Sequence, residues 1–190
     1  LNQWLTAHPT LSNAAAWYYQ MTHLAVTLTV LALTYVIAPR LYRRARSALV
    51  LCNVIALVIF FVLPVMPPRL LPGYGFVDSS VLAGFYNNDV GPVHADLYGA
   101  MPSLHVAWAL WVSMTLFLLL RKFPWRWVVF VYAATTTVVV LATANHYVLD
   151  VLAGMLVTLC AFVLAGLHPA VSRSAAPRRV PAWSADQSDG

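Results

Sequence analysis

The sequence has few charged residues. Of its 190 residues, 9% are Asp, Glu, Lys or Arg, whereas soluble domains carry about 25%. Hydrophobic residues make up 61% of the chain, and the mean hydropathy is +0.74. Several apolar runs approach the roughly 20 residues that a helix needs to cross a bilayer. The composition excludes an ordinary soluble domain and indicates an all-α polytopic membrane bundle, because helices satisfy their own backbone hydrogen bonds in lipid.

Other absences narrow the function. The two cysteines, Cys52 and Cys160, lie in apolar runs, and no Cys/His spacing resembles a zinc site. We interpret them as small buried packing residues and expect neither a metal nor another cofactor. The net charge of +5 does not indicate nucleic acid, because the basic residues lie near helix ends. No signal peptide is evident in the first 20 residues, and since the chain begins at Leu1 we expect it to be numbered from inside a longer product. Nothing in the sequence indicates an oligomeric state.

The hydrophobic pattern predicts five membrane helices, at 21–38, 47–66, 102–120, 127–143 and 146–167. Prolines and polar residues mark their ends. Pro39 ends the first helix, and the second bends at Pro64 and ends at Pro67-Pro68. Pro102 opens the third helix, and Asn145 is the expected N-cap of the fifth.

The remaining segments divide into loops and ends. Residues 1–20 mix polar and aromatic residues, which is typical of a membrane interface. Residues 67–101 form a long glycine-containing loop outside the cytoplasm; loops of this length are usually either functional or disordered, and its aromatic and apolar residues argue against disorder. We expect one transmembrane catalytic domain over 1–169 and a disordered cytoplasmic tail over 170–190.

The basic residues predict the orientation. Ten of the eleven fall in three groups: Arg40, Arg43, Arg44 and Arg46 in a loop after the first helix; Arg121, Lys122 and Arg126 between the third and fourth; Arg173, Arg178 and Arg179 after the fifth. With five spans these three groups lie on the same face of the membrane, and the positive-inside rule predicts that this face is cytoplasmic. The plasma membrane is the expected location. The long loop and the remaining polar residues then lie on the opposite face.

Five of those polar residues converge by topology: Arg69, Ser103, His105, His146 and Asp150. Ionisable residues at membrane depth are costly and usually functional. Two helix N-termini and the planar fork of an arginine suit an anion. His146 and Asp150 are four residues apart, so the carboxylate can fix the imidazole tautomer. An anion site with two histidines suggests phosphoryl transfer through a phosphohistidine, in which one histidine attacks phosphorus and the other protonates the leaving oxygen.

These residues resemble a known family. Met101-Pro102-Ser103-Leu104-His105 is similar to the Pro-Ser-Gly-His motif of the type-2 phosphatidic acid phosphatase superfamily, which has the vanadium-haloperoxidase-like fold. Residues 145–154 resemble its His-x-x-x-Asp motif and the helix that follows. Pro67-Pro68-Arg69 resembles the arginine-bearing first motif, in the form used by the branch that contains inositol phosphorylceramide synthases. The resemblance covers about residues 20–165.

The resemblance implies roles for these residues. His146 is the expected nucleophile, Asp150 its orienting partner, and His105 the general acid and later the base. Arg69 and Ser103, with backbone amides of the first turn after Ser103, hold the phosphate without a metal. The family commonly has six transmembrane helices, so either a helix precedes Leu1 or residues 1–20 stand in for it.

Two positions depart from the family pattern. Val140 occupies the place of an arginine six residues before the nucleophile, and Val62 the place of a lysine seven residues before Arg69. Thr143 and Asn145 are the candidate neutral donors that replace them.

Three further residues have two interpretations. His23 is either an interface histidine or a contact for the headgroup or acceptor. His94 and Asp96, in the long loop, are either solvated or line the mouth of the pocket.

The sequence thus predicts a membrane lipid phosphatase or phosphotransferase that acts on a lipid phosphate, with water or an alcohol such as an inositol or sugar hydroxyl as acceptor. Two alternatives remain. A proton-coupled transport module would use the histidines and Asp150 as a relay and needs polar residues throughout the membrane depth. A zinc enzyme would use His105, His146 and Asp150 as ligands.

Overall fold

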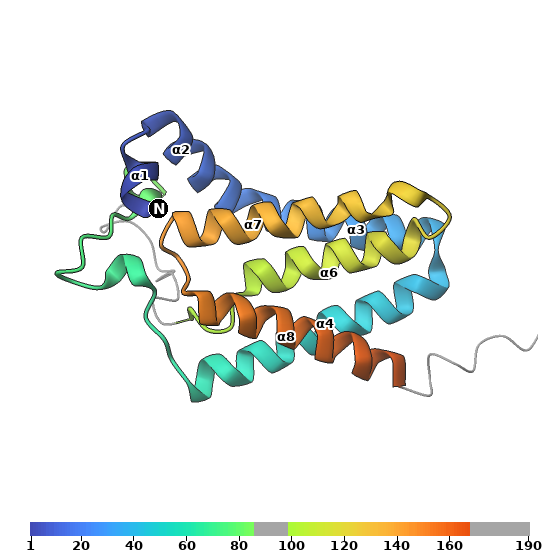
Figure 1. Cartoon of the computed structure of the whole chain (residues 1–190). Helices are drawn as coiled ribbons and strands as arrows, with labels where there is room; N and C mark the ends of the chain where they lie inside the picture. The colour runs from blue at the N-terminus through green and yellow to red at the C-terminus, as the bar shows by residue number, and fades with distance from the viewer. Residues whose placement is uncertain (86–98, 168–190) are drawn as a thin grey trace, which may run out of the picture.

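The structure is a computed structural model that describes residues 1–85 and 99–167, and its described part is helical, without strands (Figure 1). The predicted all-α membrane bundle is confirmed. The predicted tail at 170–190, His94 and Asp96 lie outside the described residues. The helices are α1 Asn2–Thr6, α2 Pro9–Trp17, a π-helical turn Tyr18–Thr22, α3 His23–Ile37, α4 Pro39–Val62, α5 Ser79–Leu82, α6 Leu104–Leu119, α7 Phe130–Ala142 and α8 Val148–Leu167, with 3-10 turns at Pro68–Leu70 and Pro124–Val129.

Four helical stretches in the described part are long and apolar enough to cross a membrane: Pro9–Ile37, Pro39–Val62, Pro124–Ala142 and Val148–Gly166. The fifth expected span, α6, is apolar but has 16 residues, which corresponds to about 24 Å at 1.5 Å per residue. It packs against α3, α4, α7 and α8 and so occupies the middle of the bundle (Figure 1).

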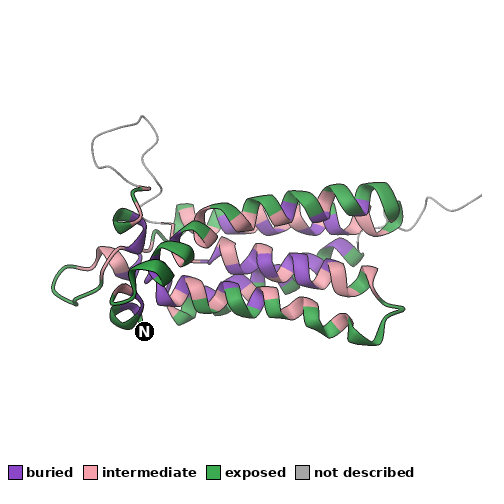
Figure 2. Cartoon of the chain, turned by 90° about the horizontal axis from the view of Figure 1, so that it is seen from above, coloured by how far each residue is buried: buried purple, intermediate pink, exposed green. Residues whose placement is uncertain are grey.

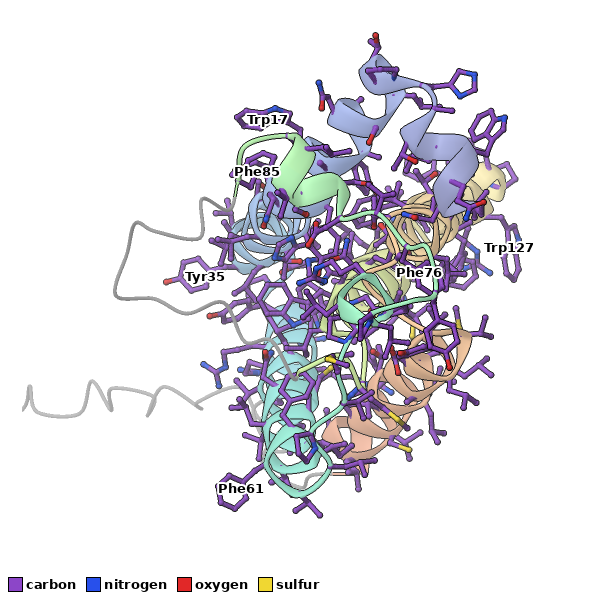
Figure 3. The ribbon with its side chains drawn as sticks, turned by 90° about the vertical axis from the view of Figure 1, so that its left-hand side faces the viewer. Trp17, Tyr35, Phe61, Phe76, Phe85 and Trp127 are labelled. Atoms are coloured by element: carbon purple, nitrogen blue, oxygen red, sulfur yellow. The ribbon has the colours of Figure 1, made fainter. Side chains whose placement is uncertain are left out.

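The outer surface of the bundle is apolar. Buried residues follow the inward faces of the helices, and the outward faces are exposed (Figure 2). Tyr35, Phe61 and Trp127 point away from the bundle (Figure 3), and Phe61 is 90% exposed. Monomeric soluble proteins rarely expose apolar patches of this extent. This surface therefore faces lipid.

Small residues let α4 and α8 approach closely. One face of α4 buries small residues spaced three or four apart, namely Ala45, Ala48, Cys52 and Ala56. The facing side of α8 also carries small buried residues, Ala161 and Ala165. Within lipid the hydrophobic effect contributes little to helix association. Small side chains let the two backbones approach closely, so that van der Waals packing stabilises the contact. Cys52 is buried as predicted, but Cys160 is exposed, because it lies on the outward face of α8.

The first two membrane helices begin and end at residues other than those predicted from the sequence. The predicted basic loop is the beginning of α4, which starts at Pro39 because proline suits the first helical position. The helix ends at Val62 rather than bending at Pro64, because a residue that precedes proline is disfavoured in the α region. Most of residues 1–20 is helical, and α2 continues through the π-helical turn into α3.

The later helices start after their predicted first residues. Helix α6 begins at Leu104 rather than Pro102, and Ser103 is its N-cap. The 3-10 turn Pro124–Val129 precedes α7. Helix α8 begins at Val148, so Asn145 is not its N-cap.

Candidate active site

Backbone hydrogen bonds join three segments at one end of the bundle, which we call the site end. The Ala100 amide donates to Val65 O at 3.0 Å, the Arg69 amide to Ala144 O at 2.9 Å, and the Ser103 amide to Asp150 O at 2.9 Å. Each of the three sequence motifs is therefore tied to another motif through the main chain.

Helices α6 and α8 touch through backbone just inside the site end. A Cβ added at Gly154 would lie well inside contact distance of Ser103 O, so only glycine fits. One turn further along α8, Thr158 Oγ1 donates to Ala107 O at 3.0 Å. This close approach fixes Ser103 and His105 relative to Asp150.

His146 has a defined tautomer. Its Nδ1 lies 2.8 Å from Ala100 O and 3.5 Å from Asp150 Oδ2. Because a carbonyl only accepts, Nδ1 carries a proton, and in the neutral ring the lone pair is therefore on Nε2. Nε2 is buried and has no hydrogen-bond partner among the described residues. The Asp150 carboxylate instead accepts from the Tyr147 amide at 2.7 Å. The backbone carbonyl, rather than the predicted carboxylate, is thus the nearer partner of the ring.

His105 is held by aromatic rings. It stacks on Tyr19 with ring centroids 3.9 Å apart and contacts His23 at 4.2 Å. The π-helical turn Tyr18–Thr22 lies immediately before His23, and such turns frequently occur at functional sites. The structure therefore brings His23 to the site. His105 Nε2 is also buried without a hydrogen-bond partner among the described residues, and the His105 and His146 centroids are 5.9 Å apart.

Arg69 is anchored on two sides. Its Nε donates to Asp78 Oδ2 at 2.9 Å, and its Nη1 donates to Asn145 Oδ1. Asn145 Nδ2 in turn donates to Thr143 Oγ1 at 2.7 Å, and that hydroxyl donates to Val139 O at 2.8 Å. Asn145 and Thr143 therefore support the guanidinium, and the Thr143 proton is directed to α7.

Only one of the two expected helix N-termini is open to an anion. In α6, Ser103 Oγ accepts from the Val106 amide at 3.4 Å, and the amides of Leu104 and His105 have no intrahelical partner by helix geometry. In α8, the Asp150 carboxylate already occupies the N-terminal turn through the Tyr147 amide. The Ser103 amide is engaged with Asp150 O, so it is not among the donors that face a phosphate.

The two departures from the family pattern have different surroundings. Val140 is fully buried against Val106 and Val151, and its carbonyl accepts the amides of Asn145 and His146. Val62 is 73% exposed at the end of α4. Neither position brings a cation to the site.

Several contributors were not recognised in the sequence. Asp78 caps α5 and also pairs with Arg69. The buried Asn2 joins Val77 to the end of α7, donating at 3.1 Å to Val77 O and to Ala142 O. Asp78-Ser79-Ser80 is a visible capping pattern, but the Ala100 carbonyl and the Tyr19 ring carry no such signal.

Tyr147 is partly exposed and lies just before α8. Burial and the nearby Asp150 carboxylate raise the pKa of its phenol, so it stays a neutral hydrogen-bonding group.

Within the described ranges, no three His, Cys, Asp or Glu side chains are arranged to hold a metal ion. The zinc alternative therefore finds no support in this geometry.

The PAP2 superfamily model matches residues 1–164, which include all three motifs. The chain belongs to the PAP2 superfamily. It is accordingly a membrane protein of phosphatase or phosphotransferase type, and PAP2 membership points to a lipid phosphate as substrate. No curated protein and no solved structure matches the chain significantly.

Proposed function

We propose that this PAP2 protein transfers the phosphoryl group of a membrane lipid to His146 and then to water or an alcohol. The observation that carries the proposal is the pair of buried imidazoles at the site end. Each has an Nε2 without a hydrogen-bond partner among the described residues, and the ring centroids are 5.9 Å apart. A buried polar atom without a partner is costly, and these two atoms belong to rings that lie close together, which supports a ligand that both rings contact.

In the first step, His146 Nε2 attacks phosphorus and a P–N bond forms. The P–O bond to the lipid alcohol breaks, and His105 gives its proton to the departing oxygen. The Ala100 carbonyl stabilises the positive charge that His146 gains, with Asp150 behind it at 3.5 Å. Arg69 and the open α6 amides face the phosphate oxygens.

In the second step, His105 takes a proton from the acceptor as the acceptor oxygen attacks phosphorus. The P–N bond breaks, and His146 returns to its starting state. Water as acceptor makes the protein a hydrolase, and an inositol or sugar hydroxyl makes it a transferase. The Pro67-Pro68-Arg69 form of the first motif favours the transferase branch by resemblance.

The proposed orientation places the site end outside the cytoplasm. Arg40–Arg46, Arg121–Arg126 and the end of α8 would then face the cytoplasm, which the positive-inside rule favours. A plasma membrane location is the simplest case. The transport alternative is weaker, because the buried polar side chains at mid-depth in the described helices are hydroxyls such as Thr115, Thr136 and Thr158, which do not ionise.

The proposal is tested by trapping the intermediate. Protein purified in detergent with EDTA is mixed with lipid carrying a labelled phosphorus, quenched in alkali, and analysed for phosphohistidine. Wild type should carry the label on His146, and His146→Ala should lose both label and turnover by at least about a thousandfold, as for other covalent nucleophiles. His8→Ala, which changes an exposed histidine of the N-terminal helices, is the matched control.

Chasing the labelled protein with water or with myo-inositol separates the two reactions. Release of inorganic phosphate in water alone identifies a hydrolase, and a labelled inositol phosphate product identifies a transferase. Full turnover by the His146→Ala variant would contradict the nucleophile assignment.

A further inference from the structure

Helix α1 contacts the site end through one buried side chain, that of Asn2. The residue is 5% exposed, and its amide group makes three hydrogen bonds. Its Oδ1 accepts from the Val77 amide at 2.9 Å, and its Nδ2 donates to Val77 O and to Ala142 O, both at 3.1 Å. Both donors of the side-chain amide are therefore engaged. Asn2 thus cross-links the segment before α5 to the end of α7.

The two segments that Asn2 joins are also the two that hold Arg69. The segment before α5 continues into Asp78, which accepts from Arg69 Nε at 2.9 Å. The turn after α7 contains Asn145, which accepts from Arg69 Nη1, and Ala144, whose carbonyl accepts the Arg69 amide at 2.9 Å. The guanidinium keeps one position only while these two segments keep a fixed separation. Asn2 supplies a direct bond between them.

The turn after α7 also needs support from outside. Ala144 has a φ of 53°, a left-handed conformation that is unfavourable for a residue with a Cβ. Such a conformation persists where surrounding contacts over-determine the backbone. Ala142 is the last residue of α7, so helix geometry leaves its carbonyl without an intrahelical donor, and Asn2 provides one. Asn2 therefore caps α7 immediately before the strained turn that holds Arg69.

We infer that Asn2 is a positioning residue for phosphate binding, which acts by fixing Arg69 through these two segments. The inference rests on the proposed function, because that function assigns Arg69 to the phosphate. Without Asn2 the guanidinium keeps its charge, but the segments on its two sides can separate. The donors of Arg69 then sample positions that do not match the phosphate oxygens. Since Asp78 and Asn145 remain as partners, we expect a loss of about tenfold in binding, less than the roughly hundredfold effect of a fully misplaced group.

A double-mutant cycle tests whether Asn2 acts through Arg69. The probe is orthovanadate, which imitates five-coordinate phosphorus, so its affinity reports binding of the transition state whatever the lipid. Calorimetry on the full chain in detergent gives the Kd for wild type, Asn2→Leu, Arg69→Gln and the double variant. Leucine has a similar shape but cannot make the three hydrogen bonds.

The expected pattern is non-additive. Asn2→Leu should raise the Kd by about tenfold, and Arg69→Gln by about a hundredfold. The double variant should bind no more weakly than Arg69→Gln alone, because a residue that positions Arg69 has no effect once the guanidinium is gone. The rate at which the labelled lipid modifies His146, measured in the same four proteins, should show the same pattern.

Asn53→Leu is the matched control. It is the same substitution in α4, where the Asn53 side chain donates to Leu49 O of its own helix at 2.8 Å. It should leave the Kd unchanged with either residue at position 69. Circular dichroism checks that each variant keeps its helices. Asn2→Ala removes the same three hydrogen bonds without adding an apolar side chain, and it replaces Asn2→Leu in the cycle if leucine prevents folding.

The outcomes separate this inference from the function on which it rests. An equal loss on removing Asn2 with Arg69 or with glutamine at that position would overturn the inference, because Asn2 would then act on the fold as a whole. Wild-type affinity in Asn2→Leu would overturn it as well. In both cases a labelled His146 in wild type leaves phosphoryl transfer standing. Neither orthovanadate binding nor a labelled histidine in wild type would overturn the proposed function together with the role of Asn2.

Discussion

Helix α8 carries a glycine near each end, and the surroundings of the two glycines differ. A Cβ on Gly154, at the site end, would collide with the carbonyl of Ser103, which is backbone. A Cβ on Gly166, at the other end, would meet the tip of Arg44 at 2.9 Å, which is a flexible side chain. The site end is built from main-chain contacts that cannot move independently. The opposite end, which we call the basic end, is covered by side chains that can.

The same difference holds for the arginines. Arg69 is fixed by Asp78 and Asn145 in a web of buried hydrogen bonds. At the basic end, Arg126 lies over the Phe117 ring at 4.1 Å, and Arg44 reaches Phe162 O at 3.5 Å. These two cations at the basic end therefore contact an aromatic ring and a helix carbonyl. The cation at the site end is fixed by side-chain hydrogen bonds, which suits the ligand-binding role that we propose for it.

The largest expected effect separates these two kinds of arginine. Arg69→Gln should lower kcat/KM by about a hundredfold or more, because it removes a charged donor aimed at the transferring phosphate. Arg126→Gln should leave kcat/KM within about threefold, since an exposed cation–π contact contributes about 0.5–1 kcal/mol. Steady-state turnover of the same lipid by both variants measures the contrast. Equal losses would mean that Arg69 acts through stability alone.

The glycine pair should show the next largest effect. Gly154→Ala should destabilise the protein by about 2 kcal/mol and lower turnover as well, because overpacking displaces Ser103 and with it His105. Gly166→Ala, the same substitution in the same helix, should cost less than about 1 kcal/mol and spare turnover, since Arg44 can move aside. Thermal unfolding in detergent and lipid turnover together check both expectations. Wild-type behaviour of Gly154→Ala would contradict the close packing of α6 against α8.

The smallest expected effect concerns the two ends of α8. Asp150→Asn should reduce turnover by about tenfold, because the Ala100 carbonyl still fixes the His146 tautomer and only the more distant charge is lost. Arg44→Gln, which removes the cation near the other end of the same helix, should lower stability by about 1 kcal/mol or less with turnover unchanged. A thousandfold loss in Asp150→Asn would instead make the carboxylate the principal partner of the histidine.

The sequence predicted the positions of the helices more completely than it predicted the contacts within the site. Apolar runs located the core of each of the four candidate spans in the described part and the shorter α6, because a bilayer demands a length and a composition that a single sequence shows. Helix limits were less certain where proline was involved: Pro39 opens α4 instead of preceding a loop, and Pro64 follows its end. The convergence of Arg69, His105 and His146 could be predicted because topology alone places them at one end.

The remaining parts of the site come from contacts that leave no mark in the sequence. The nearest partner of His146 is a main-chain carbonyl, and every residue has one. Tyr19 reaches His105 because the helix widens into a π-helical turn at Tyr18–Thr22, which propensity does not indicate. Asp78 is visible as a cap, but its second role depends on a pairing with Arg69 that only the folded chain makes.

The 16 residues of α6 have a consequence for the bilayer around the protein. At about 24 Å, this helix is shorter than the roughly 30 Å thickness of a hydrocarbon core. We infer that its first turn, with His105, lies below the plane that lipid phosphates normally occupy, or that the membrane thins beside it. A substrate phosphate must sink toward the site, or the acyl chains next to it must compress. The shortness of this central helix thus predicts that lipid turnover depends on the thickness of the membrane around the protein.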